Sequence, residues 1–276
     1  MRNPVTWTWP WRRAARPRPA APSRTSQVVA LARATMDRPH TAGGDPRAQQ
    51  RLCAGMRPAP VPSLRAHLAA RTRFFDEQVL AAIGRGTRQV VILGAGYDDR
   101  ALRFRSPGVR YTEVDHPATQ ADKRRRLAAL AGTGPVLAAA DFRAGDVPAV
   151  LAGSGHDADL DTLFICEGLL VYLEETVIVS LLSALGSRAA PGSGLVASLA
   201  THPEGLDSRH VAEVLNAGRR AGETEPWVTI LPAPAHLSLL ARSRWYADET
   251  LDGADLAADM PPGRMLLVTA GLTPRR

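Results

Sequence analysis

The stretch Val90–Phe104, "VVILGAGYDDRALRF", predicts how the chain folds around it. Four apolar residues suit a buried strand, the two glycines after them allow a tight turn, and the following residues have helical spacing. A strand, a glycine turn and a helix in this order open the nucleotide-binding units of α/β proteins. The same opening serves dinucleotides, phosphates and S-adenosylmethionine, so the glycines alone leave the ligand undecided.

The pattern on either side of this stretch alternates between strands and helices. We therefore expect an α/β fold with a mostly parallel, Rossmann-like sheet, helices on both of its faces and further helices before it. The sequence predicts strands at 89–95, 110–115, 134–141, 161–168, 194–200 and 264–272, a short strand at 226–231, and helices at 100–103, 118–131, 146–151, 174–188, 209–222 and 234–244.

Composition divides the 276 residues into a tail and one domain. Residues 1–23 are rich in Pro, Arg and Trp and are predicted to be a disordered basic extension. We expect a single domain over 24–276, with N-terminal helices at 24–88, a cofactor-binding core at 89–200 and an acceptor-side region with the last strands at 201–276. Part of the net charge of +7 therefore belongs to the tail.

Several functional classes are not expected. The basic residues are not interleaved with aromatic residues as in a nucleic-acid-binding patch, and no apolar run approaches the roughly 20 residues of a membrane span. Cys53 and Cys166 are far apart and have no CxxC spacing or nearby His pair, so neither a disulfide framework nor a metal site is predicted. We expect a cytoplasmic protein that binds neither nucleic acid nor membrane.

Acidic residues follow the predicted strands where ligands bind in open α/β sheets. Asp115, Asp141 and Glu167 each stand at the end of a strand, beyond the turn that contains Gly94 and Gly96. An acid about 20 residues after the first glycine suits the two hydroxyls of a ribose, because a carboxylate accepts several hydrogen bonds. Asp115 has this spacing, which favours an adenosine-containing ligand.

The residues after the glycines bear on which adenosine ligand binds. The third glycine of the dinucleotide fingerprint is absent, and Asp98 and Asp99 open the helix where a pyrophosphate would dock. We expect these carboxylates to repel phosphate, whereas the cationic sulfonium and amine of S-adenosylmethionine would meet no repulsion. Either aspartate also suits a helix cap, and capping is compatible with this interpretation.

Five motifs follow one another along the chain: "RTRFFDEQVL", "VVILGAGYDDRALRF", "YTEVDHPATQADKRRRL", "AADFR" and "TLFICEGLLVYL". In this order they resemble the leucine carboxyl methyltransferase family, which includes bacterial polyketide O-methyltransferases of the TcmP type. The likeness covers about Ser23 to Leu173 and implies a class I S-adenosylmethionine-dependent methyltransferase.

The resemblance implies roles for residues around S-adenosyl-L-methionine. Gly94, with Gly96, would lie against the methionine moiety, and Asp115 would hold the ribose. Asp141 and Phe142 would bind the adenine. The remaining residues that the family implies are Glu167 at the methionine end, Arg71 at the cofactor carboxylate, Arg24 as a weaker match to a basic residue near the site, and Tyr172 near the acceptor.

The acceptor is the least determined part of the prediction. A carboxylate acceptor needs only to be positioned, whereas a hydroxyl needs its proton removed, and His202 after the strand at 194–200 is the candidate base. We expect O-methylation of a small molecule, a carboxylate or hydroxyl of a polyketide-like natural product of secondary metabolism. The alternatives are an S-adenosylmethionine-binding protein without methyl transfer and an NAD-type dehydrogenase, which the missing third glycine argues against.

Overall fold

The computed structural model describes six segments of the chain. They are residues 21–57, 65–130, 132–144, 146–205, 225–256 and 264–273. Most of the predicted basic extension and the whole helix predicted at 209–222 lie outside these residues.

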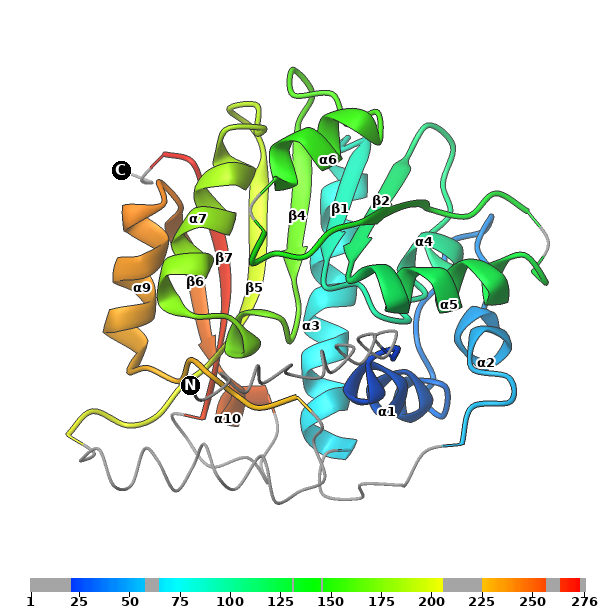
Figure 1. The fold of residues 1–276 in the computed structure, drawn as a ribbon, viewed down its shortest axis with the longest axis horizontal. Coiled ribbons are helices and arrows are strands. Elements are labelled where there is room, and N and C mark those ends of the chain that lie inside the picture. The colour runs from blue at the N-terminus through cyan, green and yellow to red at the C-terminus, as the bar shows by residue number, and fades with distance from the viewer. Residues whose placement is uncertain are drawn as a thin grey trace, which may run out of the picture.

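Within the described residues, seven strands form one sheet in the order β3-β2-β1-β4-β5-β7-β6 (Figure 1). Neighbouring strands from β3 to β5 pair in parallel, and β7 runs antiparallel to both β5 and β6. The expected mostly parallel sheet is therefore confirmed. The strands are β1 (Gln89–Leu93), β2 (Arg110–Asp115), β3 (Val136–Ala139), β4 (Thr162–Cys166), β5 (Gly194–Ala200), β6 (Tyr246–Asp252) and β7 (Met265–Gly271).

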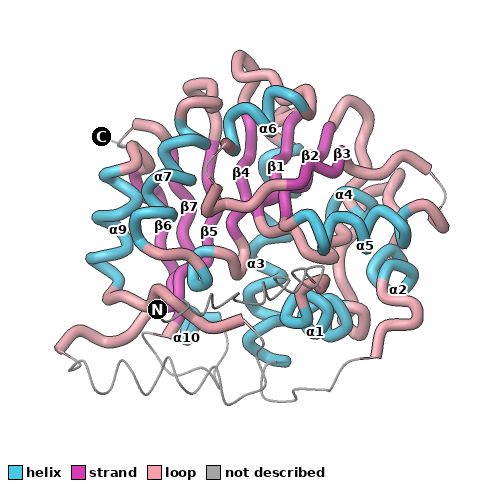
Figure 2. The backbone as a smooth tube through the Cα atoms, in the orientation of Figure 1, coloured by secondary structure: helices cyan, strands magenta, loops and turns pink. Residues whose placement is uncertain are grey.

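Helices cover both faces of the sheet, as predicted. In Figure 1, α6, α7 and α9 lie on the near face and α3 lies behind the sheet; Figure 2 shows the same layers as a backbone trace. The described helices are α1 (Arg24–Arg33), α2 (Ala48–Leu52), α3 (Arg65–Gly84), α4 (Arg100–Arg103), α5 (Pro117–Leu127), α6 (Val147–Gly153), the 3-10 helix η2 (Leu170–Tyr172), α7 (Glu175–Gly186), α9 (Ala233–Arg242) and α10 (Gly253–Leu256).

The central strand β1 is buried on both faces, which explains its continuous apolar sequence. Val91 and Leu93 pack into the cluster that includes α6 and α7, whereas Val90 and Ile92 pack into the cluster that includes α3 and α4. This two-sided burial fixes the sheet between its helical layers. The loops at the carboxyl ends of β1, β2 and β4 are thereby held at one edge.

The predicted elements differ from the structure mainly near the C-terminus. The strands predicted at 110–115 and 194–200 coincide with β2 and β5, and the helix predicted at 100–103 coincides with α4. The short strand predicted at 226–231 is reduced to one isolated bridge between Thr201 and Leu231. No helix in the described part of the chain has the length and apolarity to cross a membrane.

Candidate functional site

The glycine turn after β1 has a backbone that only glycine adopts easily. Gly94 and Gly96 have φ angles of 63° and 49°, in the left-handed region. A Cβ atom on Gly94 would lie 2.9 Å from Cδ1 of Leu169, and one on Gly96 would lie 2.6 Å from Cβ of Ser26. The turn is thus packed between the loop after β4 and the first turn of α1. Both the left-handed φ angles and these close contacts therefore disfavour a side chain at Gly94 or Gly96.

Asp115 ends β2 and is tied to this turn. Its carboxylate accepts the backbone N–H of Gly96 and, at 2.6 Å, that of His116. Burial raises the pKa of Asp115, although the two N–H groups act in the opposite direction. The side chain is partly exposed, so the orientation is fixed while lone pairs remain for further donors. This arrangement suits a vicinal pair of hydroxyls.

Asp141 and Phe142 follow β3, at the neighbouring position along the same edge. Asp141 is exposed and accepts the backbone N–H of Arg143 at 3.0 Å. Phe142 packs against the core cluster on the α6 and α7 face. A carboxylate and an aromatic ring thus follow β3 at adjacent positions, where the family resemblance implies an adenine site.

Glu167, directly after β4, is buried among three arginines. Its carboxylate bonds to Arg71 Nε at 3.0 Å, to Arg100 at 2.8 Å and to Arg33 in a short contact. Burial by itself would raise the pKa of Glu167, but the guanidiniums of Arg33, Arg100 and Arg71 hold it well below its usual range. The Glu167 carboxylate is therefore an anchor for arginines from α1, α3 and α4.

The ion pairs continue at Asp98 and Asp99, directly after the glycine turn, and form a network. Asp98 bonds to Arg100 at 2.6 Å, and its carboxylate lies 3.5 Å from Arg33. Asp99 bonds to Arg38 at 2.6 Å and to Arg103 at 3.2 Å. Burial would raise the pKa of Asp99, but Arg103 and Arg38 lower it below the ordinary value.

This pairing corrects the electrostatic argument from the sequence. Asp98 and Asp99 are 4% and 1% exposed, and both are paired with arginines. Their charges are compensated within the protein and do not form a free negative surface against a phosphate. Asp98 does act as a local cap, because its carboxylate accepts the backbone N–H of Arg100 at 2.8 Å.

Arg71 contacts a single carboxylate of this network, that of Glu167. Asp76 pairs with both Arg100 and Arg103. Among the described residues, the network therefore contains five arginines and four carboxylates. These are Arg33, Arg38, Arg71, Arg100 and Arg103, and Asp76, Asp98, Asp99 and Glu167. Arg71 reaches Glu167 through Nε. Burial lowers the pKa of Arg71 more than Glu167 raises it. Burial lowers the pKa of Arg38 in the same way, so both arginines are incompletely compensated.

The other predicted site residues are placed as follows. Tyr172, in η2, lies close enough to Arg71 to interact with it electrostatically. His202 lies just past β5 and is 9% exposed, with Nδ1 at 2.8 Å from the carbonyl oxygen of Pro203. Arg24 stands in the first turn of α1, and Arg33 at the end of that helix takes the position beside Glu167. The structure thus joins Arg71, Glu167 and Tyr172.

Sequence reasoning missed the arginines that hold Glu167 in place. Arg33 and Arg100 are 6% and 0% exposed, whereas arginines on helices are usually taken as solvated. One signal was present in the stretch Asp98–Arg103, where two acids precede two arginines in a short helix that is apolar at Ala101 and Leu102. In a helix of only four residues, burying Ala101 and Leu102 also brings the neighbouring arginines into the interior.

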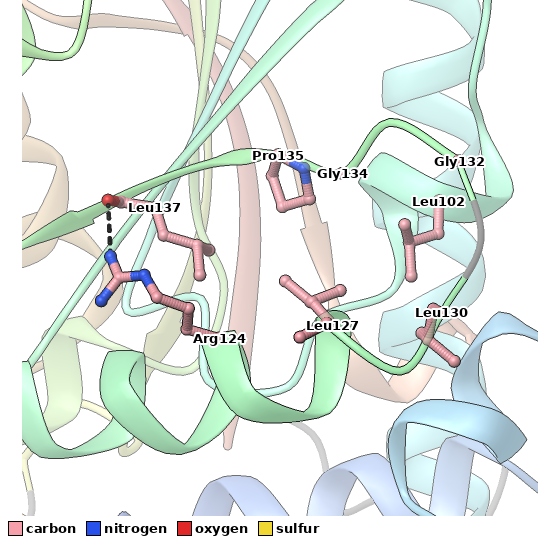
Figure 3. Close-up of a pocket in the computed structure, with 9 residues that line it drawn as sticks. Leu102, Arg124, Leu127, Leu130, Gly132, Gly134, Pro135 and Leu137 are labelled. Carbon is pink, nitrogen blue, oxygen red and sulfur yellow. Dashed lines mark hydrogen bonds between the residues drawn. The ribbon is translucent and has the colours of Figure 1, made fainter.

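A pocket of about 330 Å³ lies elsewhere, between α5, β3 and α4 (Figure 3). Its lining is mainly apolar, with Leu102, Leu127, Leu130 and Leu137 around it, and the Arg124 side chain donates to the Leu137 carbonyl at 3.4 Å. None of the predicted site residues lines this pocket. The polar groups at the carboxyl edge of the sheet are therefore the candidate site.

Comparison with known proteins gives a family match and similar proteins from two Streptomyces species. The leucine carboxyl methyltransferase family matches this chain over residues 16–186. A Streptomyces coelicolor protein named "Putative S-adenosyl-L-methionine-dependent methyltransferase" is 39% identical over 170 residues, 60% of this chain and 57% of its own length. A Streptomyces avermitilis protein of the same description is 37% identical over 186 residues, 66% of this chain and 62% of its own length.

A solved structure extends the likeness to the fold. The crystal structure of a "putative methyltransferase" from Thermobifida fusca has a TM-score of 0.58 and 17% identity, and the match covers 91% of this chain and 95% of that one. At this identity the likeness concerns the fold alone. The present chain spans about three fifths of the length of the two Streptomyces relatives.

Proposed function

Because the chain belongs to the leucine carboxyl methyltransferase family, we propose that it is an S-adenosyl-L-methionine-dependent O-methyltransferase that acts on a small-molecule acceptor. One observation carries the proposal. Asp141 after β3, Asp115 after β2, the left-handed glycine turn after β1 and the pair of Glu167 with Arg71 after β4 follow one another along a single edge of the sheet. S-adenosylmethionine offers complementary groups in the same order, namely adenine, ribose, and a methionine moiety with its carboxylate.

The residues present fit the cofactor group by group. Asp115 is oriented by two backbone N–H groups and would accept the ribose hydroxyls. Asp141 would accept the exocyclic amine of adenine, with Phe142 beside the ring. Gly94 and Gly96 carry no side chains, so the backbone of this turn could approach a methionine moiety closely.

The methionine carboxylate would be bound by Arg71. Its partner Glu167 uses its oxygens on three guanidiniums, so in this proposal Glu167 acts on the methionine end by positioning Arg71. The terminal nitrogens of Arg71 lie 3.5 and 3.6 Å from the position that a Cβ atom on Gly168 would occupy. Glycine there leaves room beside the guanidinium.

The bound cofactor supplies an activated methyl group on a sulfonium. The protein's part is then to position the acceptor in line and to exclude water. Tyr172, next to Arg71, is the side chain we assign to the acceptor side of the cofactor. A carboxylate acceptor would need no base, whereas for a hydroxyl acceptor His202 is the candidate to remove the proton. We favour an acidic acceptor, a carboxylate or phenol of a polyketide-like product, because the network carries excess positive charge.

An NAD-type dehydrogenase remains the alternative from a different class. The pairing of Asp98 and Asp99 with arginines removes the repulsion argument against it. The missing third glycine and the family match still argue against it. A protein that binds S-adenosylmethionine without transferring the methyl group would bind the same ligand but would not methylate any acceptor.

The decisive experiment compares two ligands in the variant Arg71→Met. 5′-Methylthioadenosine contains the adenosine half of the cofactor and lacks the amino acid. Arg71→Met should raise the dissociation constant of S-adenosylmethionine about tenfold or more and leave that of methylthioadenosine unchanged, since one charge-assisted contact is lost. Isothermal titration calorimetry gives both constants.

Arg73→Met is the matched control. Arg73 is exposed on the same helix, two residues further on, so its substitution should change neither constant. Equal weakening of both ligands by Arg71→Met, or no weakening of either, would contradict the assigned role of Arg71. Transfer of a labelled methyl group to aromatic acids and phenols, followed by mass spectrometry, tests the acceptor class.

A further inference from the structure

Lys123 is the only lysine in the sequence, and it is buried. Every other one of the 34 Lys and Arg residues is an arginine. Lys123 lies on α5 and is 1% exposed, although an ammonium is rarely buried without close partners. Its position between β2 and the loop after β1 suggests a specific task.

The ammonium of Lys123 joins two elements of the fold. Nζ donates to the backbone carbonyl of Asp98 at 2.7 Å and forms a short ion pair with Glu113 of β2. Gln120, one turn earlier on α5, donates to the backbone carbonyl of Glu113 at 2.9 Å. The helix α5 is thus fastened to β2 and, through Lys123, to the end of the glycine turn.

This connection completes a second attachment of the turn to β2. Near its start, Gly96 donates to Asp115 of β2. Near its end, Asp98 is held through Lys123 and Glu113, two residues before Asp115 on the same strand. The side chain of Asp98 also bonds to Arg100, the partner of Glu167. Asp98 therefore links the glycine turn to the arginine network.

We propose that Lys123 is a positioning residue for cofactor binding, which holds the glycine turn against β2 through the carbonyl of Asp98. The inference rests on the proposed function, because it assumes that the turn receives S-adenosylmethionine. A compact ammonium bonds to a carbonyl and a carboxylate that approach from different directions, whereas the planar guanidinium of arginine requires a fork of acceptors. This difference explains a lysine in a chain that otherwise uses arginine.

The test needs a variant that folds. Lys123→Met alone leaves Glu113 buried without its cation, and a buried unpaired charge is strongly destabilising. Burial raises the pKa of Glu113 to about 7, although Lys123 lowers it; Asp98 and Asp115 raise it further. A neutral glutamine therefore resembles the protonated Glu113 side chain. The double variant Lys123→Met with Glu113→Gln therefore removes the tie to Asp98 without leaving a buried charge.

Calorimetry with S-adenosylhomocysteine measures the effect. The double variant should bind at least about tenfold more weakly than the wild-type protein, in which Lys123 bonds to Asp98. Leu151→Ala, in the buried face of α6, is the control: its melting temperature should fall while its dissociation constant stays unchanged. A folded double variant that binds as tightly as the wild-type protein overturns the inference.

A second readout uses the wild-type protein. Labelling with ¹⁵Nζ-lysine should give one ammonium signal in the NMR spectrum, and S-adenosylhomocysteine should shift it. An ammonium signal whose chemical shift does not change on ligand binding overturns the inference, even if the double variant does not fold. If the wild-type protein binds no S-adenosylhomocysteine at all, the proposed function fails and this inference fails with it.

Discussion

Replacement of Glu167 by glutamine should destabilise the protein strongly, because it removes one of four carboxylates that oppose five arginines, three of them buried. Arg33 and Arg100 would keep Asp98 as a partner, whereas Arg71 would lose the acid that it contacts through Nε. Removing one partner of a buried ion pair costs about 3–5 kcal/mol. We expect the free energy of unfolding at neutral pH to fall by about that amount.

The pH dependence of this loss follows from the low pKa of Glu167. A glutamate carboxyl group ordinarily has a pKa of 4.5, and the folded state holds that of Glu167 well below this value. The folded state therefore binds fewer protons than the unfolded state at acidic pH, and the stabilisation is complete above about pH 5. The difference between wild type and Glu167→Gln should be constant from about pH 5 to 8 and should shrink as the pH falls below about 4.5.

Urea unfolding followed by circular dichroism measures both quantities. Glu174→Gln is the control, because Glu174 is exposed, and its substitution should change the free energy of unfolding by less than about 0.5 kcal/mol. If Glu167→Gln is as stable as the control at neutral pH, the arginine network does not depend on this carboxylate. A difference that grows on acidification would contradict the direction of the pKa change.

Three further outcomes are expected. Asp115→Ala should weaken S-adenosylmethionine binding by about 1.5–3 kcal/mol in calorimetry, and an unchanged dissociation constant in a folded variant would remove Asp115 from the ribose site. Gly96→Ala should lower the free energy of unfolding by about 1–3 kcal/mol, since the turn is left-handed and Ser26 blocks the methyl group, whereas a neutral effect would mean that α1 does not pack there. With a carboxylate acceptor His202→Ala should leave the methyl-transfer rate nearly unchanged, and a loss of about 10²–10⁴ would instead assign hydroxyl methylation.

Much of the fold could be predicted because the central strands have clear local patterns. The apolar residues of β1 and the glycines after it specify a buried strand and its turn, and β2 and β5 were bounded correctly. β6 was missed. Its sequence, "YADETLD", is mostly polar, and it forms the edge strand beside β7, so its pairing depends on a partner that local sequence does not identify.

The candidate site was predicted in part. The acids after the strands were identified because their position in an α/β sheet is set by topology, which sequence order already specifies. The arginine network was not, because the pairing of Arg33 with Glu167 joins residues 134 positions apart. The roles of Asp98 and Asp99 were misjudged for the same reason: their compensating partners include Arg38, which no local pattern connects to them.

Calorimetric titration of the purified chain with S-adenosylhomocysteine and, separately, with NAD tests the central claim most directly. The edge formed by Gly94, Asp115, Asp141 and Arg71 should bind S-adenosylhomocysteine with a dissociation constant on the order of micromolar and should show no NAD binding. Tight NAD binding without any S-adenosylhomocysteine binding would contradict the account and assign the glycine turn to a dinucleotide.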